Sequence, residues 1–162
     1  MKTRYLVLLL CILFTACQTD SDKQEATNFF LRGNTKFKEK EYFESIKWYT
    51  EAVQKQAQFP DAYYNRGLVY QALEKNDEAL ADFSKAVEQD PDYAPALFKK
   101  TEILQNLDRI DESLASAGVL VKNFPDSSAN WSLQGNIQMQ KSLWNESLAS
   151  YDRALALDKN SV

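Results

Sequence analysis

Histidine is absent from this chain of 162 residues, and cysteine occurs only twice, at Cys11 and Cys17. Histidine is the commonest general base and the commonest metal ligand, and a cysteine thiolate is a strong nucleophile. We therefore expect no catalytic residue, no metal site and no cofactor. The net charge of −4 also argues against binding to the phosphate backbone of a nucleic acid.

A hydrophobic run long enough to span a membrane is also missing. The apolar run from Leu6 to Phe14 is much shorter than the roughly 20 residues that a membrane-spanning helix needs. Two basic residues precede this run, and the small residues Thr15 and Ala16 lead directly to Cys17. The arrangement is typical of a secretory signal peptide.

The segment around Cys17 resembles a bacterial lipoprotein signal. This resemblance implies that residues 1–16 are removed, that Cys17 is acylated, with palmitate for example, and that residues 17–25 form a lipidated polar tether. Gln18 after the cysteine suggests the outer membrane. The alternative is an ordinary signal peptide cut near Ala16, which would leave Cys17 as a free thiol. An unpaired thiol is a liability in an oxidising compartment, which favours lipidation.

The rest of the sequence consists of four copies of one pattern, with a period of about 34 residues. The segment "NDEALADFSKAVEQDP" has three counterparts, and the segments upstream of all four also align, as in "YYNRGL" and "WSLQGN". The four copies of the first segment are residues 42–57, 76–91, 110–125 and 144–159. A repeat of this length indicates one supersecondary unit that stacks on its neighbours.

These repeats resemble the tetratricopeptide repeat. The second copy carries the family pattern at Tyr63, Gly67, Tyr70, Ala79, Phe83, Ala86 and Pro91. The resemblance implies an all-α, right-handed superhelical solenoid of about four helix pairs, with first helices that line a concave groove. We expect the repeats at residues 26–59, 60–93, 94–127 and 128–162, the third being divergent.

Small and large residues recur at fixed positions of the repeat. Glycine inside a helix costs about 1 kcal/mol relative to alanine, so Gly33, Gly67 and Gly135 predict close helix contacts. The third repeat has Thr101 instead, and Ala117 and Leu120 exchange a large and a small side chain, a swap that hydrophobic cores tolerate.

The resemblance also identifies candidate groove residues on the first helices. Phe30, Tyr64 and Phe98 form a row of aromatic side chains that we interpret as not required by the core. The alternative is that these rings are half-buried neighbours of adjacent helices. The complete set of candidate residues is Phe30, Asn34, Tyr64, Asn65, Leu68, Phe98, Lys99, Glu102 and Asn136.

The groove does not match the carboxylate-clamp subfamily, which captures the carboxylate terminus of chaperone tails. Asn34, Asn65 and Lys99 stand at three of its five positions, but Phe30 and Pro95 replace two lysines. A single cation cannot supply the charge-assisted hydrogen bonds that such capture requires.

The two ends of the stack differ. Asn28, Arg32, Lys36 and Lys40 recur every four residues and predict a polar N-terminal cap. At the other end, Trp144, Leu148, Tyr151 and Leu155 predict an apolar face through which the last repeat could self-associate or bind a partner.

Two function classes remain open. The favoured one is a membrane-anchored scaffold in the bacterial cell envelope, which binds a peptide or a helix in its groove. The alternative is an envelope enzyme that acts on a glycan or a peptide through Asp, Glu or Tyr side chains.

Overall fold

The computed structural model describes the backbone of residues 2–159 and the side chains of residues 20–159. Its secondary structure is helical, with no strand in that range. The helices are α1 (Lys2–Lys38), α2 (Tyr42–Lys55), α3 (Pro60–Ala72), α4 (Asn76–Gln89), α5 (Ala94–Asn106), α6 (Ile110–Asn123), α7 (Ser128–Gln140) and α8 (Trp144–Lys159).

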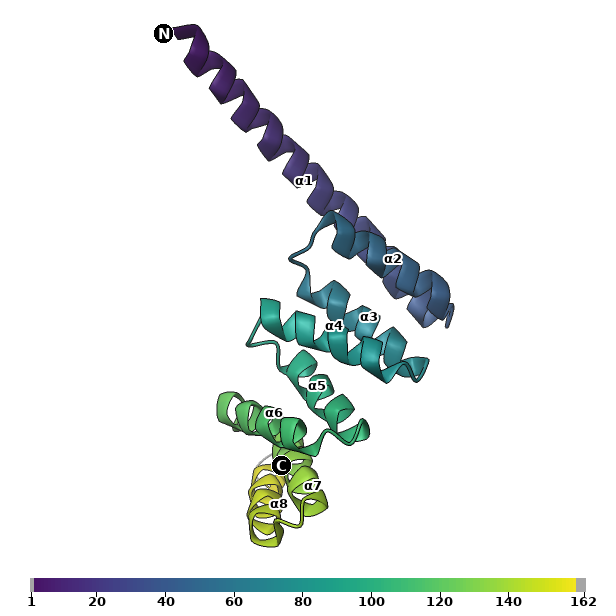
Figure 1. The fold of residues 1–162 in the computed structure, drawn as a ribbon, viewed down its shortest axis with the longest axis vertical. Coiled ribbons are helices and arrows are strands. Elements are labelled where there is room, and N and C mark those ends of the chain that lie inside the picture. Colours follow the sequence, from purple (N-terminus) through teal and green to yellow (C-terminus); the bar gives the residue numbers. More distant parts are fainter. Residues whose placement is uncertain (1, 160–162) are drawn as a thin grey trace.

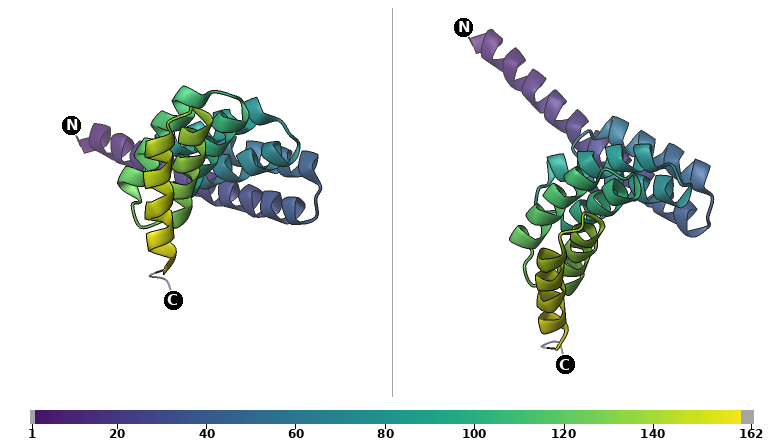
Figure 2. Two further views of the ribbon diagram at one scale, coloured as in Figure 1. Left: turned by 90° about the horizontal axis from the view of Figure 1, so that it is seen from below. Right: turned by 60° about the horizontal axis from the view of Figure 1, so that its bottom comes forward.

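The helices form consecutive pairs that stack into a curved array (Figures 1 and 2). The pairs are α1 with α2, α3 with α4, α5 with α6, and α7 with α8, and each pair contacts the next. This architecture confirms the predicted all-α superhelix. The core is distributed along the stack in clusters centred on Val53, Phe83 and Leu120.

The turns inside the four helix pairs share one backbone geometry. Lys40, Glu74, Asp108 and Ser142 occupy the same position of successive repeats, and all have φ values between 57° and 62°. The residue after each turn donates its N–H to a carbonyl of the preceding helix, as Lys75 does to Tyr70 at 2.9 Å. This is the Schellman arrangement, which terminates a helix through one left-handed residue.

Close contacts inside the pairs explain the recurring glycines. A Cβ atom on Gly33 would lie 2.6 Å from the Tyr49 ring, and one on Gly135 would lie 2.9 Å from the Tyr151 ring. In these two repeats a serine of the second helix also donates to the glycine carbonyl, Ser45 to Gly33 and Ser147 to Gly135, both at 2.9 Å. The predicted close approach is confirmed.

The third repeat keeps its helix pair with different side chains. Thr101 is fully buried, and its hydroxyl donates to the Leu97 carbonyl at 2.8 Å and lies 2.7 Å from the Ser116 hydroxyl. Ala117 and Leu120 are also fully buried, in a cluster with Leu97. The exchange of large and small residues is therefore accommodated in the core, as predicted.

Residues 17–25, predicted as a lipidated tether, are part of helix α1. This stretch contains neither glycine nor proline, so nothing in it breaks a helix. Lys55 of α2 forms ion pairs with Asp22 at 3.9 Å and Glu25 at 2.7 Å, which hold the end of the segment against the stack. The Cys17 side chain lies outside the described residues. Within the described part of the chain, no helix is both long and apolar enough to cross a membrane.

Candidate partner-binding face

The first helices of the repeats are α1, α3, α5 and α7. Helix α1 contacts α3, α5 contacts α7, and α3 and α5 share the hydrophobic cluster of Phe83, so we call the combined surface of these helices the first-helix face. Asn65 donates its side-chain amide to Asn34 Oδ1 at 2.9 Å, which joins α3 to α1. Gln105 likewise donates to Gln140 at 3.1 Å, which joins α5 to α7. The nine candidate groove residues are all on these four helices.

The three aromatic candidates are only half-buried, but each packs against the core. Phe30 lies 5.0 Å from Phe59 between ring centroids, and Tyr64 lies 5.2 Å from Tyr93. Phe98 packs against the cluster of Leu120. The interpretation that the core does not require these rings is therefore wrong. They are half-buried neighbours of adjacent elements, and a partner could contact only their exposed parts.

The side-chain oxygens of two candidate asparagines, Asn34 and Asn136, already accept hydrogen bonds inside the protein. Asn34 Oδ1 also accepts a hydrogen bond from the Tyr49 hydroxyl at 2.7 Å. Asn136 Oδ1 accepts from the Tyr151 hydroxyl at 2.6 Å, although Asn136 is exposed. The amide NH₂ groups of Asn34 and Asn136 have no protein partner among the described residues, which leaves these two groups as donors for a ligand, whereas the NH₂ group of Asn65 donates to Asn34.

Polar side chains of α5 add charge to the face. Lys99 Nζ lies 2.7 Å from Glu102 Oε2, and both side chains are about one-third exposed. Leu68 of α3 is partly buried against the Phe83 cluster. The face therefore offers an ion pair, amide donors and ring edges, which are groups that bind an extended peptide or a helix.

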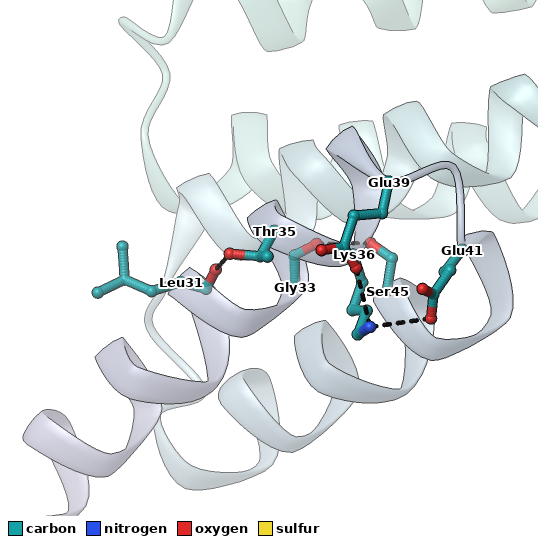
Figure 3. A network of polar contacts seen from close by, with 7 residues as sticks. All are labelled: Leu31, Gly33, Thr35, Lys36, Glu39, Glu41 and Ser45. Atoms are coloured by element: carbon teal, nitrogen blue, oxygen red, sulfur yellow. Dashed lines mark hydrogen bonds and ion pairs between the residues drawn. The ribbon is translucent and has the colours of Figure 1, made fainter.

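Ion pairs engage one lysine of the predicted polar cap at the N-terminal end of the stack. Lys36 pairs with Glu39 at 2.8 Å and with Glu41 at 2.9 Å (Figure 3). The hydrogen bonds that Lys36 donates to these two carboxylates raise the pKa of Lys36. Lys40 lies beyond the end of α1, in the left-handed turn. The predicted polar stripe therefore ends at Lys36 on the helix, and the charge of Lys36 is paired.

Sequence reasoning missed an ion pair inside the second repeat. Arg66 donates from Nε and Nη2 to the two Asp82 carboxylate oxygens at 2.8 and 2.7 Å, and from Nη1 to Thr50 at 3.0 Å. The guanidinium also lies 5.5 Å from the Tyr63 ring and 6.0 Å from the Tyr70 ring. Burial opposes the charge of Arg66, but Asp82 outweighs it and raises the pKa. One arginine therefore joins α2, α3 and α4.

The C-terminal end exposes Trp144, Leu148 and Leu155 of the predicted apolar face, whereas the Tyr151 ring packs against Gly135 inside the repeat. Leu148 is 62% exposed and Leu155 is 56% exposed. Their equivalents in earlier repeats, Leu80 and Val121, are both 8% exposed. The last repeat thus presents a surface that a following repeat would cover.

The ionisable groups of the first-helix face do not form an acid and base pair. Burial raises the pKa of Tyr64, and burial together with the hydrogen bond to Asp61 raises that of Tyr93. Both phenols therefore remain protonated at neutral pH and are poor bases. Glu102 is held by Lys99. Among the described residues, no group of three or more acidic or cysteine side chains could hold a metal ion.

Three family models match the sequence, all described as tetratricopeptide repeats. They cover residues 33–74, 60–93 and 95–127, which together make up more than half of the chain. Among curated proteins, none matches the sequence significantly.

Solved structures of tetratricopeptide repeat proteins share this fold at low sequence identity. MamA (residues 41 to the end) from Desulfovibrio magneticus RS-1 matches with a TM-score of 0.77 and 16% identity, over 83% of this chain and 76% of that chain. YrrB, described as having an unusual peptide-binding site, matches with a TM-score of 0.74 and 23% identity, over 96% of this chain and 79% of that chain.

A third neighbour was solved with a peptide. The first tetratricopeptide repeat domain of Spaghetti (RPAP3), bound to the HSP90 peptide SRMEEVD, matches with a TM-score of 0.70 and 22% identity, over 74% of this chain and 95% of that chain. The repeat period, the stacked helix pairs and the family matches agree. This chain belongs to the tetratricopeptide repeat family.

Proposed function

We propose that this protein is a lipid-anchored scaffold of the bacterial cell envelope, whose first-helix face binds a peptide or a helix of another envelope protein. The observation that carries the proposal is the continuity of this face. Asn34 and Asn65 join the first two repeats, and Lys99, Glu102 and Asn136 extend the polar surface along the stack.

The fold neighbours support a polypeptide partner. One was solved with a bound peptide, and another is described by its peptide-binding site. Repeats of this family typically serve as interaction modules rather than enzymes. The raised tyrosine pKa values and the paired Glu102 give the alternative of an envelope glycan- or peptide-cleaving enzyme no catalytic pair.

A charge exchange tests the first-helix face without disturbing the helix. Lys99→Glu with Glu102→Lys keeps an ion pair at the same spacing but exchanges the positions of the positive and the negative charge on the surface that a partner would contact. The matched control, Lys85→Glu with Glu88→Lys, exchanges an equivalent pair on α4. In a crosslinked pull-down of the full chain from native membranes, we expect the first variant alone to lose its partners. Equal recovery by both variants would contradict the assignment, and an empty wild-type list would favour the enzyme.

The anchor rests on the sequence around Cys17, and we test it separately. We expect Cys17→Ser to prevent acylation, so that the mass of the N-terminal fragment lacks acyl chains and the protein leaves the membrane fraction. Cys11→Ser should change neither readout, because residues 1–16 would be removed from the mature protein. An unmodified Cys17 in the wild-type protein would contradict lipidation.

We also propose that the exposed α8 face supports self-association. Apolar side chains that internal repeats bury are uncovered at Leu148 and Leu155, and such patches commonly form interfaces. Light scattering of the full chain should give a larger mass for the wild-type protein than for Leu148→Glu with Leu155→Glu. The control exchanges the exposed polar residues Asn145 and Asp152 for alanine. Equal masses for all three proteins would exclude self-association through this face.

A further inference from the structure

A hollow of about 390 Å³ lies between the second and third repeats. It is formed by α4, α5 and α6, and so by different helix surfaces from the first-helix face. Its lining is mostly apolar, with one lysine and one glutamate. The lining residues are Val87, Leu97, Lys100, Leu104, Glu112, Ala115, Ser116 and Val119.

The hollow occupies the place that the buried ion pair fills one repeat earlier. Lys100 takes the repeat position of Arg66, and Ser116 takes the repeat position of Asp82. In the second repeat, Asp82 places its carboxylate against the Arg66 guanidinium at 2.7 Å. In the third repeat the cation is retained and the carboxylate is replaced by a hydroxyl.

The walls of the hollow also differ from those of the second repeat. Leu97 and Leu104 take the positions of Tyr63 and Tyr70, whose rings lie against the Arg66 guanidinium. Val119, 47% exposed, borders the opening. The other three repeats carry charged residues at the position of Val119, namely Glu51, Lys85 and Arg153. Compared with the second repeat, the third repeat therefore lacks two aromatic rings, a carboxylate and a surface charge around the hollow.

No side chain of the described residues takes the place of Asp82. The Ser116 hydroxyl lies 2.7 Å from that of Thr101. Glu112 accepts two hydrogen bonds from Arg109, both at 2.7 Å. Within residues 20–159, Lys100 forms no ion pair, although its charge helps to lower the pKa of Glu112 after the larger effect of Arg109. Lys100 therefore has no carboxylate in ion-pair contact, and the Glu112 carboxylate that also lines the hollow is bound to Arg109.

We propose that this hollow binds an acidic side chain of a partner polypeptide together with a neighbouring aliphatic side chain. The partner carboxylate would pair with Lys100, as Asp82 pairs with Arg66. The aliphatic group would cover Val87, Leu104 and Val119. A side-chain carboxylate is the group that the fold itself places at this position in the second repeat, and the hollow is too large for a carboxylate alone. This binding site is independent of the proposed first-helix face.

Two matched peptides test the proposal. The full chain, held in lipid nanodiscs to avoid competing detergent, is titrated with fluorescein-labelled Gly-Leu-Glu-Leu-Gly-amide or its Gln counterpart, and binding is followed by anisotropy. We expect the Glu peptide to bind about tenfold more tightly, because a hydrogen bond to a charged group is stronger than one to a neutral group.

Three variants assign that difference to the hollow. Lys100→Gln should abolish the preference for Glu over Gln, whereas Lys122→Gln, at an exposed lysine further along α6, should preserve it. Ser116→Asp should weaken binding of the Glu peptide about tenfold by pairing with Lys100 inside the protein. Circular dichroism of each variant checks that the helices remain intact.

Several outcomes would overturn the proposal. These are equal binding of the two peptides, a preference that survives both Lys100→Gln and Ser116→Asp, or no binding at about 1 mM peptide. Binding of decanoate in place of either peptide would assign the hollow to a fatty acid and would also reject a polypeptide partner. None of these results bears on the first-helix face, which neither Lys100 nor Ser116 forms.

Discussion

A Cβ atom on Gly67 would lie 2.7 Å from Cε1 of Phe83, closer than carbon atoms approach without a clash. The second repeat therefore needs glycine in α3 because α4 presents a ring at that point. The third repeat has the opposite arrangement: the larger Thr101 stands at the glycine position, and the smaller Ala117 stands at the position of Phe83. The sizes of these two positions are thus coupled.

Gly67→Ala should destabilise the protein by about 1–3 kcal/mol, because the added methyl group forces the Phe83 ring to shift in a packed core. Gly118→Ala is the matched control. A Cβ at Gly118 meets no atom within 4 Å, and alanine should stabilise that helix by roughly 0.5–1 kcal/mol. Urea unfolding measures both changes. The same sign of change for the two variants would contradict the packing explanation.

A double-mutant cycle tests the coupling itself. Phe83→Ala alone should cost about 3–5 kcal/mol, since it leaves a cavity, and Gly67→Thr alone should clash with the ring. The double variant reproduces the small-for-large exchange seen at Thr101 and Ala117. It should be more stable than the sum of the single changes predicts, with a coupling energy of roughly 0.5–3 kcal/mol. Additive changes would mean that the two positions are independent.

The buried ion pair predicts a large effect at one carboxylate. Asp82→Ala leaves the Arg66 guanidinium in a mostly buried site without its partner, and should destabilise the protein by about 3–5 kcal/mol. Glu88→Ala removes the partner of exposed Lys85 and should change stability by no more than about 0.5 kcal/mol. If thermal unfolding shows similar losses for the two variants, Asp82 does not have this role.

Buried tyrosines predict a loss of stability at alkaline pH. Burial raises the pKa of Tyr49 to about 12, from an ordinary value of 10.0. Between these two values the unfolded chain loses the phenol proton while the folded chain retains it. The contribution of the protonated Tyr49 phenol to the free energy of unfolding is therefore complete below pH 10 and is lost as the pH rises toward 12. Tyr49→Phe should make unfolding measurably less dependent on pH in this window. An unchanged slope would show that Tyr49 does not contribute.

The repeat pattern predicted the helix pairs and the glycine contacts because both depend on residues inside one repeat. Gly67 and Phe83 recur with the period, so their contact could be inferred without coordinates. The packing role of Phe30 and Tyr64 could not be inferred in this way. Their burial depends on Phe59 and Tyr93, which lie just before the first helix of the following repeat.

Other features were missed because they break the period. Asp82 stands where other repeats have Trp48, Ser116 or Ser150, and this irregular position was the available sign of the ion pair. A comparison of this position with that of Arg66 across the repeats would have suggested the pair. The hollow at Lys100 arises from the same irregularity, but its volume also depends on how α4 lies against α5 and α6, which the sequence pattern does not specify.

The most direct test of the scaffold function is site-specific photocrosslinking in living cells. A photoreactive side chain replaces Glu102 on the first-helix face or, as a control, the exposed Glu44 on α2, which lies outside both proposed binding sites. The account predicts that the residue at position 102 crosslinks a distinct envelope protein in the full-length chain and that the residue at position 44 does not. A partner captured from position 44 alone, or the same partner from both positions, would contradict binding at the first-helix face.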